Sequence, residues 1–119
     1  MSTLKADTIV AADGTSPVTL TKQSAAKAWV NGSNSAVLSA SFSISSGTDN
    51  GTGDYSYALS NAFSSGNFAQ QSTSGSNSPT HSAVSNPDRI TSSVLAIETS
   101  NNTTNSDKEH HITAHGDLA

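Results

Sequence analysis

Alternating apolar and polar residues are the main local signal along this chain. The clearest run is "AVLSASFSIS", residues 36–45, in which Ala, Leu, Phe and Ile occupy every second position and Ser most of the positions between. "DYSYALS" and "RITSSVLAIET" show related patterns, and clusters of Gly, Asn, Asp and Ser separate the runs. A period of two is the period of a half-buried strand, so the pattern predicts an all-β protein.

The spacing of these runs predicts the architecture. About eight short strands, separated by turn-forming clusters, are typical of a β-sandwich or an intertwined β-assembly. We therefore expect a small antiparallel β-sandwich over residues 25–119, preceded by an extended N-terminal segment, residues 1–24. The apolar positions of the alternation predict its core: Trp29, Leu38, Phe42, Ile44, Tyr55, Tyr57, Leu59, Leu95 and Ile97. For the aromatic residues, a sugar-stacking surface is the alternative to core packing, which we favour.

Composition adds an oligomer to this picture. Charged residues make up 12% of the chain and hydrophobic residues 33%, and Ser, Thr and Asn fill most of the rest. Such a chain has little apolar surface to bury, which brings it close to the composition of disordered proteins. Because the net charge is only −4, we instead expect β-structure in which several copies pool their apolar strips.

Charge and hydropathy exclude several partners. The acidic balance and the scattered Lys and Arg residues give no reason to expect nucleic acid or an anionic membrane as a partner. Cysteine is absent, so disulfides and thiolate metal sites are excluded. No apolar run has the length of a signal peptide or of a membrane-spanning segment. We expect synthesis in a cytoplasm and no membrane insertion.

The stretch "TDNGTGD" has two interpretations. Asp49, Asn50 and Asp54 supply oxygen atoms that suit a cation, but the ligand spacing and bidentate Glu of a calcium loop are missing. The residues also suit a hairpin turn between two alternating runs, with Asn50 and Gly51 at its centre and Gly53 beside them. We favour the hairpin.

Histidines near the end of the chain are the second chemical candidate. His111 and His115 would share one face of a strand, with His110 on the other. In a symmetric trimer, a strand near the axis would bring three copies of one histidine together, which could bind a transition metal. Exposed histidines on a polar sheet edge are the simpler interpretation, and we favour it.

Catalytic signatures are missing from the sequence. No serine lies in a G-x-S-x-G elbow, and Glu98 and Glu109 are the only glutamates available for a pair of catalytic carboxylates. We therefore predict a protein that is not an enzyme and that carries no cofactor.

Two stretches carry a resemblance to a known family. "TLTKQSAAKAWVN" (residues 19–31) and "SFSISSGTDNGTGDYSYALSNAF" (residues 41–63) resemble a small module of tailed-bacteriophage fibre proteins, abundant in phages of cyanobacteria and other aquatic bacteria. The opening "STLKADTIVAADGTSPVTLTKQ" is similar to the segment that precedes this module, and "HITAHGDLA" to its last strand. The chain departs from the family pattern after "WVN", where Gly32-Ser33-Asn34 replaces Phe-Asn-Gly.

The resemblance implies a virion structural protein that forms a homotrimer and acts in host adsorption. Residues 1–24 would attach it to another virion protein of the tail, baseplate or an adaptor. The β-domain would contact host surface polysaccharide or an outer-membrane component. A capsid or tail decoration protein without a receptor role is the alternative, and a polysaccharide depolymerase is the alternative from another class. The short strands of the anchoring segment would add to the sheet edge of a neighbouring virion protein. The apolar residues of these strands are Leu4, Ile9, Val10, Val18 and Leu20.

Overall fold

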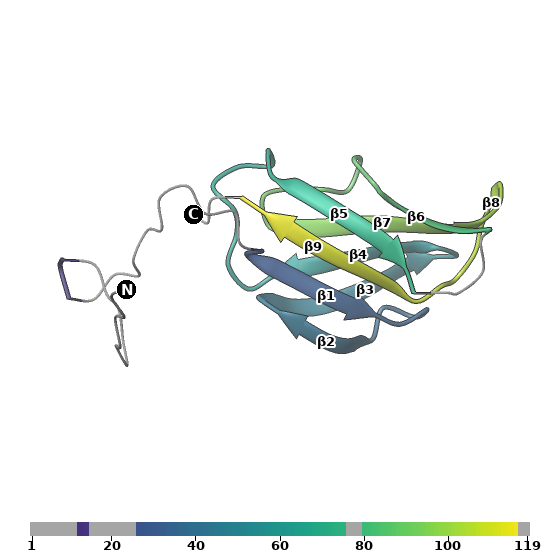
Figure 1. The fold of residues 1–119 in the computed structure, drawn as a ribbon, viewed down its shortest axis with the longest axis horizontal. Coiled ribbons are helices and arrows are strands. Elements are labelled where there is room, and N and C mark those ends of the chain that lie inside the picture. Colours follow the sequence, from purple (N-terminus) through teal and green to yellow (C-terminus); the bar gives the residue numbers. More distant parts are fainter. Residues whose placement is uncertain (1–11, 15–25, 76–79, 117–119) are drawn as a thin grey trace, which may run out of the picture.

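A computed structural model describes residues 12–14, 26–75 and 80–116, and it contains two antiparallel β-sheets packed together (Figure 1). The described residues form nine strands, and none of them lies in a helix that could cross a membrane. The strands are β1 (Ala28–Gly32), β2 (Leu38–Phe42), β3 (Ile44–Gly51), β4 (Asp54–Leu59), β5 (Ala69–Ser74), β6 (His81–Ser85), β7 (Val94–Asn101), β8 (Thr104–Asn105) and β9 (His110–His115). The predicted antiparallel β-sandwich is confirmed. The anchoring residues Leu4, Ile9, Val10, Val18 and Leu20 lie outside the described residues.

Each sheet is built from strands that are far apart in the sequence. The first sheet has the order β2-β1-β9-β5, and the second has the order β3-β4-β7-β6 with β8 paired to β7. Figure 1 looks onto the first sheet, with the second behind it. Strands β1 and β9, from opposite ends of the described chain, are neighbours and pair from Ala28↔Ala114 to Gly32↔His110. The fold is therefore closed by pairing between the first and last strands.

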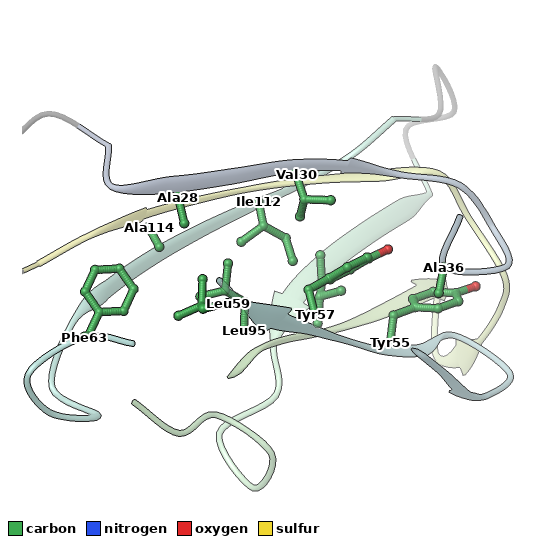
Figure 2. Packing of buried hydrophobic residues seen from close by; sticks show 11 residues of the cluster. Ala28, Val30, Ala36, Tyr55, Tyr57, Leu59, Phe63, Leu95, Ile112 and Ala114 are labelled. Carbon is green, nitrogen blue, oxygen red and sulfur yellow. The ribbon is translucent and has the colours of Figure 1, made fainter. Parts of the chain in front are cut away.

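The core lies between the sheets. Tyr55, Tyr57 and Leu59 of β4 are buried beside Leu95 and Ile97 of β7. The first sheet contributes smaller side chains, and Figure 2 shows these pointing toward the β4 residues: Ala28, Val30, Ile112 and Ala114. Each large side chain in this layer stabilises the fold by roughly 1.5–3 kcal/mol through burial. The core predictions for β4 and β7 agree with this burial.

The core predictions for β1 and β2 need correction. Trp29 is 39% exposed and Phe42 is 57% exposed, so neither belongs to the core. Strand β1 turns Ala28 and Val30 inward, and because side chains alternate, Trp29 must point outward. Phe42 is the register partner of Trp29 and therefore lies on the same outer face. Leu38 and Ile44, by contrast, are partly buried and pack against the core as predicted. Leu38 faces inward although Phe42 of the same strand faces outward, because the β1–β2 register shifts between these two residues.

The run "AVLSASFSIS" is not one strand. Strand β2 ends at Phe42 and pairs with β1 in the first sheet, whereas β3 begins at Ile44 and pairs with β4 in the second. Ser43 between them has a φ of 60°, a left-handed conformation that a continuous strand does not contain. The chain changes sheet at this residue, and this reverses the side to which later alternate residues point. Ile44 consequently packs on the core although Phe42, two positions earlier, is exposed.

The hairpin at "TDNGTGD" is present, but its turn lies further along the chain than predicted. Gly51 pairs with Asp54, which leaves Thr52 and Gly53 as the two-residue loop. The register shifts between Asp49 and Gly51, so Asn50 is an extra residue in the strand and not a turn residue. Gly53 has a φ of 67°, which favours glycine at this position.

Candidate functional site

A buried polar cluster lies beneath the hairpin turn. The Tyr57 hydroxyl lies 2.7 Å from His110 Nε2, and His110 Nδ1 lies 2.8 Å from the Lys108 carbonyl oxygen. Because a carbonyl only accepts, Nδ1 carries the ring proton and Nε2 accepts from the Tyr57 hydroxyl. The Tyr55 ring stacks on His110 with 4.5 Å between ring centroids. The prediction that the histidines lie exposed on a sheet edge is therefore wrong for His110, which is fully buried on an inner strand.

The same cluster connects the β3–β4 hairpin by hydrogen bonds to the segment that precedes β9. Asp107 Oδ1 accepts hydrogen bonds from the Gly53 amide at 2.7 Å and from the Tyr55 hydroxyl at 2.9 Å. Burial, followed by the hydrogen bond to Asp107, raises the pKa of Tyr55 to about 12. Burial also raises the pKa of Tyr57 and lowers that of His110. Both hydroxyls are thus hydrogen-bond donors in the interior, and the cluster has a structural role.

Three polar side chains of "TDNGTGD", those of Asp49, Asn50 and Asp54, contact other groups of the protein. Asp49 Oδ1 accepts from the Gly51 amide at 3.0 Å, and Asn50 Nδ2 donates to the Ser56 hydroxyl at 3.1 Å. Asp54 Oδ2 forms an ion pair with Arg89 at 3.0 Å. These contacts hold the hairpin and its neighbouring loop together, which supports the structural interpretation over an ion site.

Carboxylates come together at one place on the second sheet. Asp54 of β4 and Glu98 of β7 are register partners. Arg89 binds the first, as above, and Asn86 Nδ2 donates to Glu98 Oε1 at 3.0 Å. Residues 86–89 form the loop after β6, so the two carboxylates hold this loop against the sheet. That contact gives the pair a structural role.

The two metal candidates share the outer face of β9. His111 is exposed and His115 is half-buried, and both point away from the side that carries His110, Ile112 and Ala114. Within residues 12–14, 26–75 and 80–116, no group of three or more metal-ligating side chains comes together. A site shared between copies of the chain stays a prediction. The edge position expected for them is wrong, since β9 lies between β1 and β5.

The outer face of the first sheet is the surface on which aromatic and hydrogen-bonding side chains gather. We call it the aromatic face and define it by the outward-pointing residues of β1, β2, β5 and β9. They are Trp29, Asn31, Ala40, Phe42, Ala69, Gln71, Thr73, His111, Thr113 and His115. The strand register places Phe42, Trp29, Thr113 and Gln71 in one row across the sheet. The next row is Ala40, Asn31, His111 and Thr73.

The aromatic face carries no formal charge at neutral histidine. The four strands read AWVNG, LSASF, AQQSTS and HHITAH, without Asp, Glu, Lys or Arg. In the second sheet, β3, β4 and β7 contain Asp49, Asp54 and Glu98. The aromatic face is thus an uncharged and partly apolar surface on an acidic protein, and large exposed apolar side chains that adjoin one another often mark binding sites.

Sequence reasoning assigned Trp29 and Phe42 to the core and so missed this surface. The signal that could have found it is the alternation of "AKAWVNG", in which Ala28 and Val30 can be the buried pair only if Trp29 points out.

No protein-family model, curated protein or solved structure matches the chain.

Proposed function

We propose that the chain is a non-enzymatic binding module of a tailed-phage virion, of the tail-fibre type, which is made in the host cytoplasm and lies on the outside of the particle. Its β-domain contacts the host surface, and residues 1–24 attach it to another virion protein. The observation that carries the binding role is the aromatic face, on which Trp29 and Phe42 lie side by side and exposed.

Four further features support the proposal. The stretches 19–31 and 41–63 resemble a phage-fibre module. Stretch 41–63 contains the β3–β4 hairpin, whose side chains make structural contacts. The carboxylates Asp54 and Glu98 hold a loop, which favours binding over the depolymerase alternative. A rigid two-sheet scaffold with an uncharged surface suits adhesion, where many weak contacts are multiplied by copy number.

Deleting residues 2–24 tests the anchoring role. The truncated protein should keep the β-sandwich, seen as an unchanged β-type circular dichroism spectrum, because the described core contains no residue of this segment. It should be missing from purified phage particles. Incorporation of truncated protein at the level of the full chain would contradict anchoring. Copy number in the same particles separates a fibre, present in a few trimers, from a decoration protein present in hundreds of copies.

Native mass spectrometry of the full chain tests the homotrimer. We expect a trimer as the main species, since a sheet built from small and polar residues leaves each copy little apolar surface to bury on its own. A folded monomer as the only species over the micromolar range would contradict it. That outcome would leave the anchoring test unaffected.

A further inference from the structure

We propose that the aromatic face binds an uncharged polysaccharide, whose sugar rings stack on Trp29 and Phe42. This inference rests on the proposed function and assigns its ligand class and its surface. The binding groups it uses lie on the strands of the first sheet and not in loops.

The two aromatic rings are held in place by the sheet. Trp29 lies on β1, which is paired on one side with β2 and on the other with β9, and its cross-strand partner on β2 is Phe42. Directly opposed residues of an antiparallel pair have Cβ atoms about 4.5–5.5 Å apart. The two rings therefore project from neighbouring positions of a hydrogen-bonded sheet. Binding a ligand there costs no conformational entropy for ordering the backbone. One face of a sugar ring is a layer of C–H groups, which are attracted to the electron-rich face of an aromatic ring.

Hydrogen-bonding groups surround the rings. Gln71 lies in the same row as Trp29, and Asn31 and His111 lie opposite each other in the next row. Gln71 and His111 are exposed and Asn31 is half-buried. Amides and imidazole both donate and accept, which matches the hydroxyl groups of a sugar. A stacking surface edged by such groups combines the apolar and polar contacts that a polysaccharide offers.

The charge pattern of the aromatic face favours an uncharged polysaccharide over an anionic or a cationic one. The strands that form the aromatic face have no Lys or Arg to pair with carboxylate or sulfate groups, and no Asp or Glu to pair with amines. The nearest charged residues in the sequence are Lys27 and Glu109, which directly precede β1 and β9, so a charged ligand would find a partner only beyond the strand ends.

The size of the face argues against a second copy of the chain as the sole occupant. Four strands about 4.8 Å apart span about 14 Å, and the three outward positions of β5 and β9, about 6.8 Å apart, span about 14 Å along the strands, which is on the order of 200 Å² in projection. A stable protein interface buries about 800 Å² on each partner. A patch about 14 Å across would form only part of such an interface, whereas it is wide enough for a few sugar rings.

Titration of the full chain with polysaccharides tests the proposal. Trp29 is the only tryptophan, so its fluorescence reports directly on the face. The probes are dextran, mannan and agarose as uncharged polysaccharides, and polygalacturonate as an anionic one. At least one uncharged polysaccharide should shift the Trp29 emission and retard the protein in affinity electrophoresis. The retardation should not change between low and high salt, because no ion pair contributes.

Matched variants locate the binding. Trp29→Ala and Phe42→Ala should each weaken retardation by about tenfold or more, since each removes one stacking ring. The control is Val84→Ala, which removes a side chain of similar exposure, 54%, from the second sheet. It should bind as the unmodified chain does. All three positions are at the surface, so the variants should fold, which circular dichroism checks.

Three results would overturn the proposal. The first is that none of the uncharged polysaccharides binds, and the second is that Val84→Ala loses as much affinity as Trp29→Ala. The third is that Trp29 emission changes with protein concentration alone while the protein associates, which would assign the face to a second copy. None of these results bears on whether the protein is incorporated into virions. Failure of the polysaccharide proposal can therefore be distinguished from failure of the proposed function.

Discussion

Replacing Gly32 by alanine should destabilise the protein by about 3 kcal/mol or more. A methyl group at this position would lie 2.7 Å from His110 Nε2 and 2.9 Å from Tyr57 Cζ, and closer still to the Tyr57 hydroxyl. Tyr57 and His110 are fully buried and hydrogen-bonded to each other, so moving either side chain disturbs the packed core. The methyl group must therefore separate the pair, and this adds the cost of unpaired buried polar groups to the cost of overpacking.

Urea unfolding of two glycine variants provides the measurement. Gly66→Ala is the control, because the nearest atom to its added methyl would be the Ser92 amide nitrogen at 3.9 Å. This variant should stay within about 0.5 kcal/mol of the unmodified chain. Adding Tyr57→Phe to Gly32→Ala should recover part of the loss, since it removes the atom with the closest contact. Equal stability of Gly32→Ala and Gly66→Ala would show that Tyr57 and His110 can repack.

Acidification should destabilise the protein through His110. Burial lowers the pKa of this histidine in the folded state, partly opposed by its hydrogen bond to the Lys108 carbonyl and assisted by nearby His111. In the unfolded chain the imidazole has its ordinary pKa of about 6.5. Below that pH the unfolded state binds the proton more readily than the folded state, so the free energy of unfolding falls as pH falls. The slope is at most about 1.4 kcal/mol per pH unit, and it ends at the folded-state pKa.

Urea unfolding at several pH values between about 7.5 and 5 measures this effect. The comparison is the double variant His110→Leu/Tyr57→Phe, which replaces both partners of the hydrogen bond by apolar groups and so leaves no histidine to protonate there. Its stability should change less with pH than that of the unmodified chain. Parallel pH profiles would show that the buried histidine is not the source of the acid sensitivity.

The parts of the fold that the sequence predicts are those in which residues close together in the chain determine the local structure. Alternation within β4 places Tyr55, Tyr57 and Leu59 in the core, and the glycines and aspartates of "TDNGTGD" mark a hairpin. These features depend on strand period and turn chemistry alone. The position of the turn at Thr52 and Gly53 was not predicted, and there the Gly53 amide donates to Asp107, a residue from a distant segment.

Ser43 is the point at which local reasoning fails. The alternation of Phe42 and Ile44 is unbroken in the sequence, yet the two residues belong to different sheets. A serine gives no sign of the left-handed conformation that moves the chain from one sheet to the other. The aromatic face was missed for the same reason, since the outward position of Phe42 follows from its pairing with Trp29 and not from its neighbours in the chain. The buried position of His110 likewise follows from tertiary contacts with Tyr55 and Tyr57.

The pairing of β1 with β9 has a mechanical consequence. Ala28 and Ala114 are register partners, so the chain enters and leaves the sandwich at neighbouring positions, with Cα atoms about 5 Å apart. A domain with adjacent ends can be inserted into a surface loop of another protein without stretching that loop. Pulling on the two ends would load the β1–β9 hydrogen bonds one after another, as in opening a zipper.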